Sequence, residues 1–210
     1  MYWRKRELNY NILIPEIPER AKSLDDLTPQ EAEEFFNWYI GKIPERVQYL
    51  SSYSGIALDY SVDSLVDIWA WFLGIVEIEK TPPARMSELK KDLGGMPRDM
   101  ANEVLKEHAR QPTLESMYIA KDIGMYDGEV SVRNNNALYW GYHTDVKKDS
   151  FANRPLVMGY EDRNFDPPWQ YYDDPDFFVT GCAESASMGL AYPTQLLEGY
   201  EKMQKGVHNS

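Results

Sequence analysis

Few residues in this sequence are suited to nucleophilic or metal chemistry. The chain has one cysteine, Cys182, and three histidines, His108, His143 and His208. A nucleophilic cysteine needs a base such as His143 within hydrogen-bonding reach, and nothing in the spacing of the two residues brings them together. A zinc site would need carboxylates as further ligands, because Cys182 stands alone. We therefore expect no metal site, and we interpret Cys182 as a small buried residue of the core.

Motifs that bind nucleotides or phosphates, or that carry catalytic metals and nucleophiles, are missing from the sequence. It contains no G-x-G-x-x-G, no G-x-x-x-x-G-K-[ST], no H-E-x-x-H and no G-x-S-x-G. In such motifs the glycines let the backbone approach phosphate, and the spaced histidines or the serine carry the chemistry. We therefore expect no cofactor, and we assign no catalytic residue.

A more suggestive segment spans residues 162–178, where acidic and aromatic side chains alternate with prolines. The acids do not have the spacing of an EF-hand loop, so a calcium site is not favoured. Trp169, Tyr171 and Tyr172 belong to residue types that are enriched in interface hot spots. We predict that these aromatics form a protein-binding surface together with Asp173 and Asp174. The alternative is that they cover the core of this half of the chain.

A third polar group accompanies a hairpin that we predict at 129–143. Glu129 and Arg133 would share one face of its first strand, because residues four apart in a strand point the same way. Trp140 would lie on the facing strand, close to His143. We include Glu129, Arg133 and Trp140 among the candidate binding residues. A cross-strand ion pair is favoured here over an acid–base catalytic group.

The charge of the chain restricts its partners. With 22 Lys and Arg against 34 Asp and Glu, the formal net charge is −12. Such a charge repels nucleic-acid phosphates and anionic lipid at long range, and it favours a basic protein partner. From 161 to 176 six acids and one arginine concentrate −5 of this charge. We expect a protein partner, and neither nucleic acid nor a membrane.

Two features favour the cytoplasm. A single cysteine permits no intrachain disulfide, which fits a reducing compartment. The basic start of the chain is not followed by the apolar run of a signal peptide, because Asn9, Asn11, Pro15 and Pro18 interrupt it. The most apolar stretch, 65–78, is shorter than the ~20 residues that a membrane span needs. We interpret that stretch as a buried helix.

The hydrophobic periodicity predicts helices first and strands later. Thr28, Pro29 and Glu31 form a helix start with a capping box. Helices are predicted at 28–50, 61–78, 84–93, 98–109, 113–126 and 193–203. Strands are predicted at 129–133, 138–143, 155–160 and 177–180. Helices followed by strands indicate an α+β fold, with an N-terminal helical layer on a small antiparallel sheet and a C-terminal helix. We predict one domain over 1–210, helical at about 28–126 and sheet-containing at about 127–204.

One run of residues resembles the sequence of a known group of proteins. The run 122–130 (DIGMYDGEV), followed by Asn134-Asn135 and by 138–142 (LYWGY), resembles a family of uncharacterised bacterial cytoplasmic proteins. In that family a helix ending in D-I-x-x-Y-x-G-E leads into a strand and a Trp-bearing partner strand. The resemblance covers most of residues 1–160. It departs at Asp127, where a larger and often apolar residue is expected. The family arrangement is also similar to small immunity proteins of bacterial toxin systems, an analogy of fold and not of function.

These observations lead to one favoured function and two alternatives. We predict a non-catalytic protein-binding module, such as an immunity or inhibitor protein for a basic toxin or enzyme. The first alternative is an enzyme of unfamiliar type, with a cleft that uses Glu129, Arg133, His143 or Cys182. The second is a homodimer whose aromatic side chains serve self-association.

Overall fold

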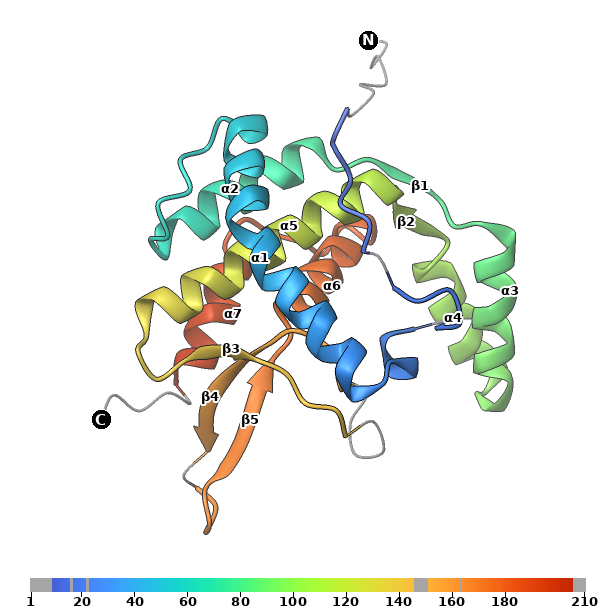
Figure 1. The fold of residues 1–210 in the computed structure, drawn as a ribbon. Helices are drawn as coiled ribbons and strands as arrows, with labels where there is room; N and C mark the ends of the chain where they lie inside the picture. The colour runs from blue at the N-terminus through green and yellow to red at the C-terminus, as the bar shows by residue number, and fades with distance from the viewer. Residues whose placement is uncertain (1–8, 16, 22, 146–150, 163, 206–210) are drawn as a thin grey trace.

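A computed structural model of the chain describes residues 9–15, 17–21, 23–145, 151–162 and 164–205. These residues form an α+β fold, as predicted, in which α-helices dominate and two small antiparallel sheets complete the structure (Figure 1). The elements in chain order are η1 (Leu24–Asp26), α1 (Pro29–Ser54), α2 (Asp63–Ile75), β1 (Ile78–Lys80), α3 (Pro83–Asp92), η2 (Leu93–Gly95), α4 (Arg98–Glu107), β2 (Arg110–Pro112), α5 (Leu114–Asn134), β3 (Tyr139–Gly141), β4 (Leu156–Asp162), β5 (Trp169–Asp173), α6 (Pro175–Ser187) and α7 (Gln195–Gln204).

The first long helix begins where the capping residues predict. The Thr28 side chain accepts a hydrogen bond from the Glu31 backbone N–H, and the Glu31 carboxylate accepts one from the Thr28 N–H at 2.8 Å. Gly55, with a φ of 73°, ends the helix in a left-handed conformation. Pro44 lies within the helix, which continues past it to Ser54.

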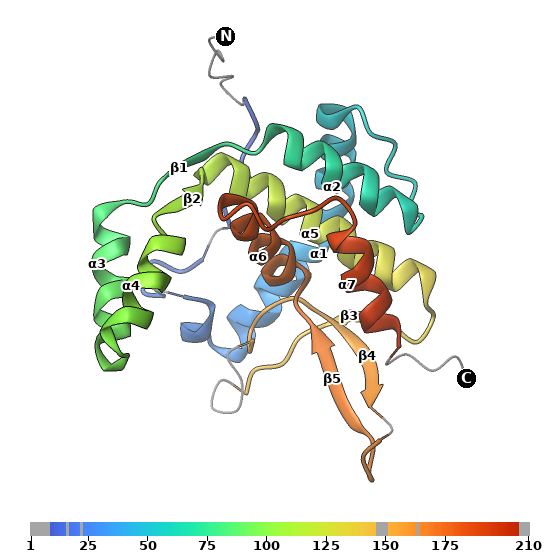
Figure 2. The ribbon, with the colours of Figure 1, turned by 180° about the vertical axis from the view of Figure 1, so that it is seen from behind.

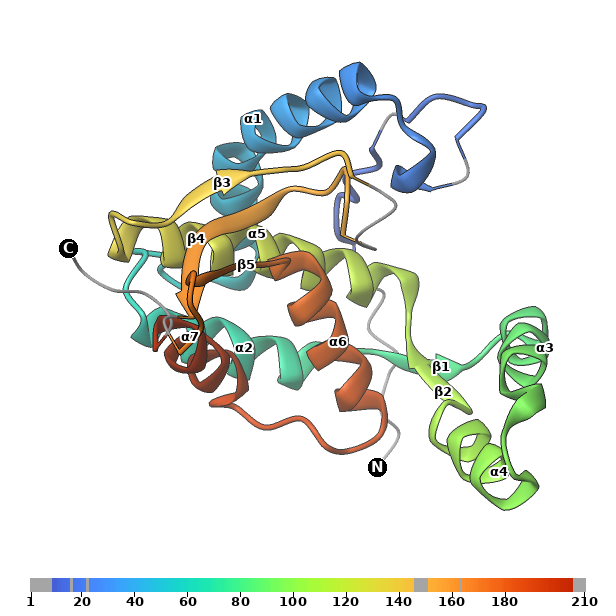
Figure 3. The ribbon, with the colours of Figure 1, turned by 90° about the horizontal axis from the view of Figure 1, so that it is seen from below.

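Helix α5 is the centre of the molecule. It lies between α1 on one side and α2, α6 and α7 on the other, as the view from below shows (Figure 3). Most of its residues from Ile119 to Ser131 are buried. Leu65, Ile68 and Trp69 of α2 are also fully buried and join the same core. The apolar stretch 65–78 is thus largely a core helix, as its composition predicts. None of the helices in the described ranges is both long and apolar enough to cross a bilayer.

The predicted strand at 129–133 is wrong, because α5 continues through it to Asn134. Val130 and Ser131 are both buried, so the alternation of small and β-branched residues reflects a helix enclosed on several sides. Gly128 does not end the helix. A Cβ atom at Gly128 would lie 2.3 Å from the Trp140 ring, so the glycine permits close packing between α5 and β3. The helix therefore also crosses the boundary that we predicted between a helical part and a sheet-containing part near residue 127.

The three-stranded sheet has the order β3-β4-β5, with both pairs antiparallel. The strands predicted at 138–143 and 155–160 correspond to β3 and β4, whereas β5 was not predicted. The register shifts between Val157 and Tyr160, where Gly159 has a φ of 107°. The hairpin of β4 and β5 extends beyond the helical body (Figures 1 and 2).

The predicted strand at 177–180 is also wrong, because Phe177–Thr180 belong to α6. The side chain of Asp174 accepts a hydrogen bond from the Phe177 N–H at 2.9 Å, and Pro175 occupies the first turn. This N-cap and proline start a helix despite the β-forming residues that follow. The predicted closing helix is confirmed as α7.

Helices α3 and α4 form an arm at one end of the molecule, joined to the body by β1 and β2 (Figure 3). Both helices lie within the predicted ranges 84–93 and 98–109, apart from one residue at the start of α3. Neither contains a fully buried residue. The arm is therefore held by partly buried contacts rather than by the central core.

Candidate functional site

The predicted binding segment divides into an exposed tip and a buried base. Residues 164–170, at the tip of the β4–β5 hairpin, are all exposed. Phe165 is 54% and Trp169 63% exposed, and their rings meet edge to face with centroids 6.0 Å apart. We call these seven residues the hairpin tip. The tip presents two large aromatic side chains to solvent as one paired unit.

Acidic residues flank this aromatic pair in the sequence. Asp162 accepts a hydrogen bond from the Asn164 backbone N–H at 2.9 Å, and Glu161 accepts one from the Gln170 side chain at 2.6 Å. Asp166 lies exposed between the two aromatics in sequence. The bond between Glu161 and Gln170 links β4 and β5 next to the hairpin tip.

The other predicted loop residues lie at the base of the hairpin. Tyr171 stacks on Tyr160, with the ring centroids 5.4 Å apart. Tyr172 packs beside His143, with the ring centroids 5.2 Å apart. Asp173 is partly buried, and Asp174 is buried as the N-cap of α6. Of the five residues that we predicted in this surface, the structure presents Trp169 openly and uses the others largely for packing and capping.

Glu129, Arg133 and Trp140 do come together, but in another way than predicted. Arg133 donates to Glu129 at 2.8 Å as an i,i+4 pair on α5, and the Trp140 indole N–H donates to the same carboxylate at 2.9 Å. The Arg133 guanidinium lies 3.8 Å from the centre of the Tyr60 ring. This cluster joins α5 to β3 and to the segment before α2, so its polar groups are engaged within the protein.

Cys182 is poorly suited to act as a nucleophile. It is 4% exposed, and burial raises the pKa of its thiol to about 12, with the nearby Asp127 adding to the effect. A neutral thiol at pH 7 attacks slowly, because the thiolate is the reactive form. Within the part of the chain that the structure describes, no three His, Cys, Asp or Glu side chains converge to hold a metal ion.

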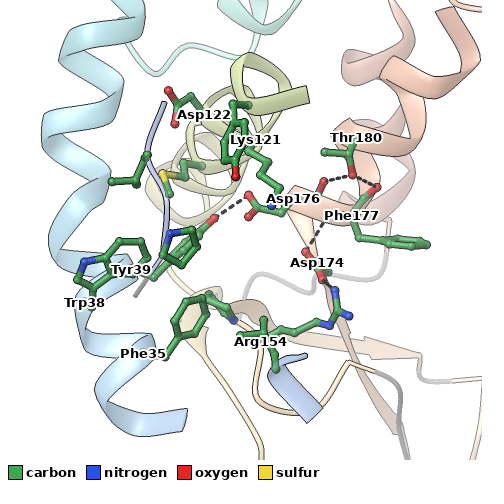
Figure 4. Close-up of a pocket in the computed structure, with 16 residues that line it drawn as sticks. Phe35, Trp38, Tyr39, Lys121, Asp122, Arg154, Asp174, Asp176, Phe177 and Thr180 are labelled. Atoms are coloured by element: carbon green, nitrogen blue, oxygen red, sulfur yellow. Dashed lines mark hydrogen bonds and ion pairs between the residues drawn. The ribbon is translucent and has the colours of Figure 1, made fainter. Parts of the chain in front are cut away.

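A cavity of about 180 Å³ lies between α1, α5 and α6 (Figure 4). Aromatic and charged side chains line it together, among them Phe35, Trp38, Tyr39, Lys121, Asp122, Arg154, Asp174 and Asp176. The Tyr39 hydroxyl donates to Asp176 at 2.8 Å, and Arg154 lies 3.7 Å from Asp174. Burial and the neighbouring Asp174 raise the pKa of Asp176 to about 7. This cavity could hold a small polar molecule, but its carboxylates already have partners within the protein.

The most buried of these carboxylates belongs to an ion pair. Arg46 Nε donates to both Asp122 oxygens, at 3.0 and 3.1 Å, and the Tyr10 hydroxyl donates to the same carboxylate. Arg46 also donates to the Asn11 carbonyl oxygen at 2.7 Å, which fastens the N-terminal segment to α1. Our sequence reasoning missed this network. Its signal was Arg46 itself, a charged residue on a helix face otherwise formed by apolar residues such as Ile43, Val47 and Leu50.

Comparison of the chain with protein families, curated proteins and solved structures finds no match. The resemblance of residues 122–130 to a bacterial family therefore stays a prediction.

Proposed function

We propose that the chain is a protein-binding module and that it engages a basic protein through the hairpin tip. The observation that carries the proposal is the exposed edge-to-face pair of Phe165 and Trp169 on a hairpin that extends beyond the body. The net charge of −12 favours a basic partner, so the chain would be an immunity or inhibitor protein for a basic toxin or enzyme.

Three physical features support this surface. Tryptophan and other aromatic residues dominate interface hot spots, because they bury large areas with few rotatable bonds. Glu161, Asp162 and Asp166 lie within eight residues of both aromatics in the sequence, and the whole chain has a formal charge of −12. Opposite charge on a partner would increase the rate of association and favour the correct orientation. Such a module would act in the cytoplasm, where a single free cysteine remains reduced.

The alternative of an enzyme built on four predicted residues has weaker support. Glu129 is bound by both Arg133 and Trp140. The thiol of Cys182 is buried and its pKa is raised to about 12. Groups in these states would need to be released or activated before they could act on a substrate.

The test is affinity capture of partners from the native host with the full chain as bait. Wild type would be compared with a Phe165→Ala/Trp169→Ala double variant and with Leu190→Ala, a control that removes a 67% exposed apolar side chain from another element. We expect a basic protein that binds wild type and the control directly after purification, and that the double variant loses. Equal binding of the purified partner to the double variant would overturn the proposed surface.

Self-association through the same aromatics is the competing outcome. Light scattering on the purified chain separates the two cases, because a dimer has twice the mass of 24.4 kDa. We expect the monomer mass for both wild type and the double variant. A dimer that the double variant abolishes would contradict a tip that is free for another protein.

A further inference from the structure

A second cavity, of about 160 Å³, lies between α5, the end of β5, α6 and α7. Its lining residues are Asp127, Ser131, Asp173, Phe178, Gly199, Tyr200, Lys202 and Met203. A Cβ atom at Gly199 would lie 2.2 Å from the Phe178 ring, so glycine at this position lets that ring form a wall of the cavity. The lining of the cavity thus combines aromatic and apolar side chains with acidic groups.

Asp127 is the unusual member of this lining. It is 3% exposed, and its Oδ1 atom has no hydrogen-bond partner within the described residues. Asp122, five residues earlier on the same helix, is equally buried but is held by Arg46 and Tyr10. A buried carboxylate without a cation or donors is costly, because nothing replaces its lost hydration, so burial raises the pKa of Asp127 and favours its protonated form until a cation is present. The position of Asp127 therefore lacks a positive or hydrogen-donating group.

The groups that face Asp127 cannot supply that cation. Asp173 of β5 raises the pKa of Asp127 further, in addition to the effect of burial. The negative charge of Asp127 in turn raises the pKa values of Tyr160, Cys182 and Tyr200. These neighbours, from β4, α6 and α7, are all acids or weak acids. Lys202, the one cation of the lining, is exposed to solvent.

We propose that this cavity binds the ammonium group of a compact alkylamine between Asp127 and Asp173. The ammonium would donate hydrogen bonds to the two carboxyl groups and to the Ser131 hydroxyl, and the alkyl chain would lie against Phe178, Tyr200 and Met203. An apolar cavity of roughly 150 Å³ accommodates a molecule the size of benzene, so an alkyl chain of about four to six carbons fits. The proposal is independent of the hairpin tip.

Other ligand classes fit this lining less well. Two carboxyl groups repel an anion. A metal ion needs more ligands, and no cluster of three His, Cys, Asp or Glu suited to a metal occurs among the residues that the structure describes. A compact organic cation satisfies both the charge and the apolar wall.

The test is calorimetric titration of the full chain with n-butylammonium chloride, with n-butanol as the neutral analogue of similar size. Asp127→Asn removes the charge but keeps the shape of the side chain, and Asp67→Asn removes an exposed carboxylate of α2 as the matched control. We expect wild type and Asp67→Asn to bind the amine, Asp127→Asn to lose at least about tenfold in affinity, and n-butanol to bind no better to wild type than to Asp127→Asn. Absence of amine binding to wild type, or equal binding to Asp127→Asn, would overturn the proposal.

A measurement on wild type alone tests the proposal even if the Asp127→Asn variant does not fold. Amide chemical shifts of wild type should move on addition of n-butylammonium at residues 127–131 and 199–203. Changes confined to other parts of the chain would contradict the assignment. The same titration with Nα-acetyl-lysine methylamide distinguishes the source of the amine. If it also binds, a lysine side chain of another protein can enter the cavity, and if only the free amine binds, the site serves a small molecule.

Discussion

At the scale of single residues, the buried carboxyl groups differ in whether another side chain of the protein binds them. Asp122 is paired with Arg46 and Tyr10, whereas Asp127 is bound by no partner that the structure describes. Asp176 is intermediate, since it accepts one hydrogen bond from Tyr39. These differences determine what each side chain contributes to stability, and they lead to two predictions.

Breaking the Arg46–Asp122 pair should strongly destabilise the protein. Arg46→Met leaves a buried carboxylate uncompensated and releases Asn11, so we expect the free energy of unfolding to fall by about 3–5 kcal/mol. Lys42→Met is the matched control, since it removes the surface pair with Glu45, and such pairs contribute about 0–1 kcal/mol. Urea denaturation of both variants measures the difference. Equal destabilisation by the two substitutions would show that the buried pair has no special role.

Stability should decrease as the pH rises through the neutral range. Burial and Asp174 raise the pKa of Asp176 from 3.8 to about 7, so the folded protein holds a proton that the unfolded chain has released. The stabilising effect of this proton is complete below pH 3.8 and is lost as the pH rises through about 7. The denaturation midpoint of wild type should therefore be lower at pH 8 than at pH 5. In Asp176→Asn, which still faces Tyr39, Lys121 and Asp174, this difference should become smaller. A midpoint that rises with pH in wild type would refute this assignment.

At the scale of elements, the sequence predicts a helix well where its capping residues are explicit. Thr28 and Glu31 mark the start of α1, and Thr113 accepts from the Ser116 N–H at the start of α5. The failure at 129–133 occurred in α5, where residues on more than one face are buried and the hydrophobic pattern loses its helical period. The failure at 177–180 has another reason, because there β-forming residues follow directly on the N-cap and proline that start α6.

The candidate sites show a similar limit. The exposure of Trp169 follows from its place among prolines and acids, which sequence reasoning recognised. The pairing of Arg46 with Asp122, 76 residues apart, depends on how α1 packs on α5. No local pattern specifies that contact, so neither the polar network nor the two cavities could be predicted from the sequence.

Contact between α5 and β3 should depend on the absence of a side chain at Gly128. In Gly128→Ala the new methyl group would meet the Trp140 ring at 2.3 Å, so we expect a loss of about 1–3 kcal/mol in the free energy of unfolding. Gly181→Ala in α6 is the control, because nothing lies within 4 Å of its Cβ position. The control should be neutral or more stable by up to about 1 kcal/mol, since alanine favours the helix. Thermal denaturation compares the two, and a neutral Gly128→Ala would contradict the close packing.

The arm of α3 and α4 should open before the core does. Neither helix has a fully buried residue, whereas α5 is largely buried. Local opening free energies follow such differences in burial. Hydrogen–deuterium exchange should therefore label the amides of 83–107 well before those of α5. Equal protection of the two regions would mean that the arm unfolds only together with the core.

At the scale of the whole molecule, the structure separates two kinds of acidic residue that the sequence groups together. Asp174 lies in the interior and Asp173 and Asp176 are partly buried, while Asp166 is exposed on the hairpin tip beside Phe165 and Trp169. The net charge of −12 favours a basic protein partner at any part of the surface. The exposed acid and aromatic pair of the hairpin tip make this the surface at which we expect that partner to bind.

The most direct measurement of the central claim is calorimetric titration of a captured basic partner, once purified, against wild type and against Phe165→Ala/Trp169→Ala. Truncation of one hot-spot aromatic costs about 2 kcal/mol or more, so a hot spot at either position alone raises the dissociation constant by at least ~30-fold, while Leu190→Ala should bind like wild type. An unchanged dissociation constant in the double variant would contradict the claim that the hairpin tip is the binding surface.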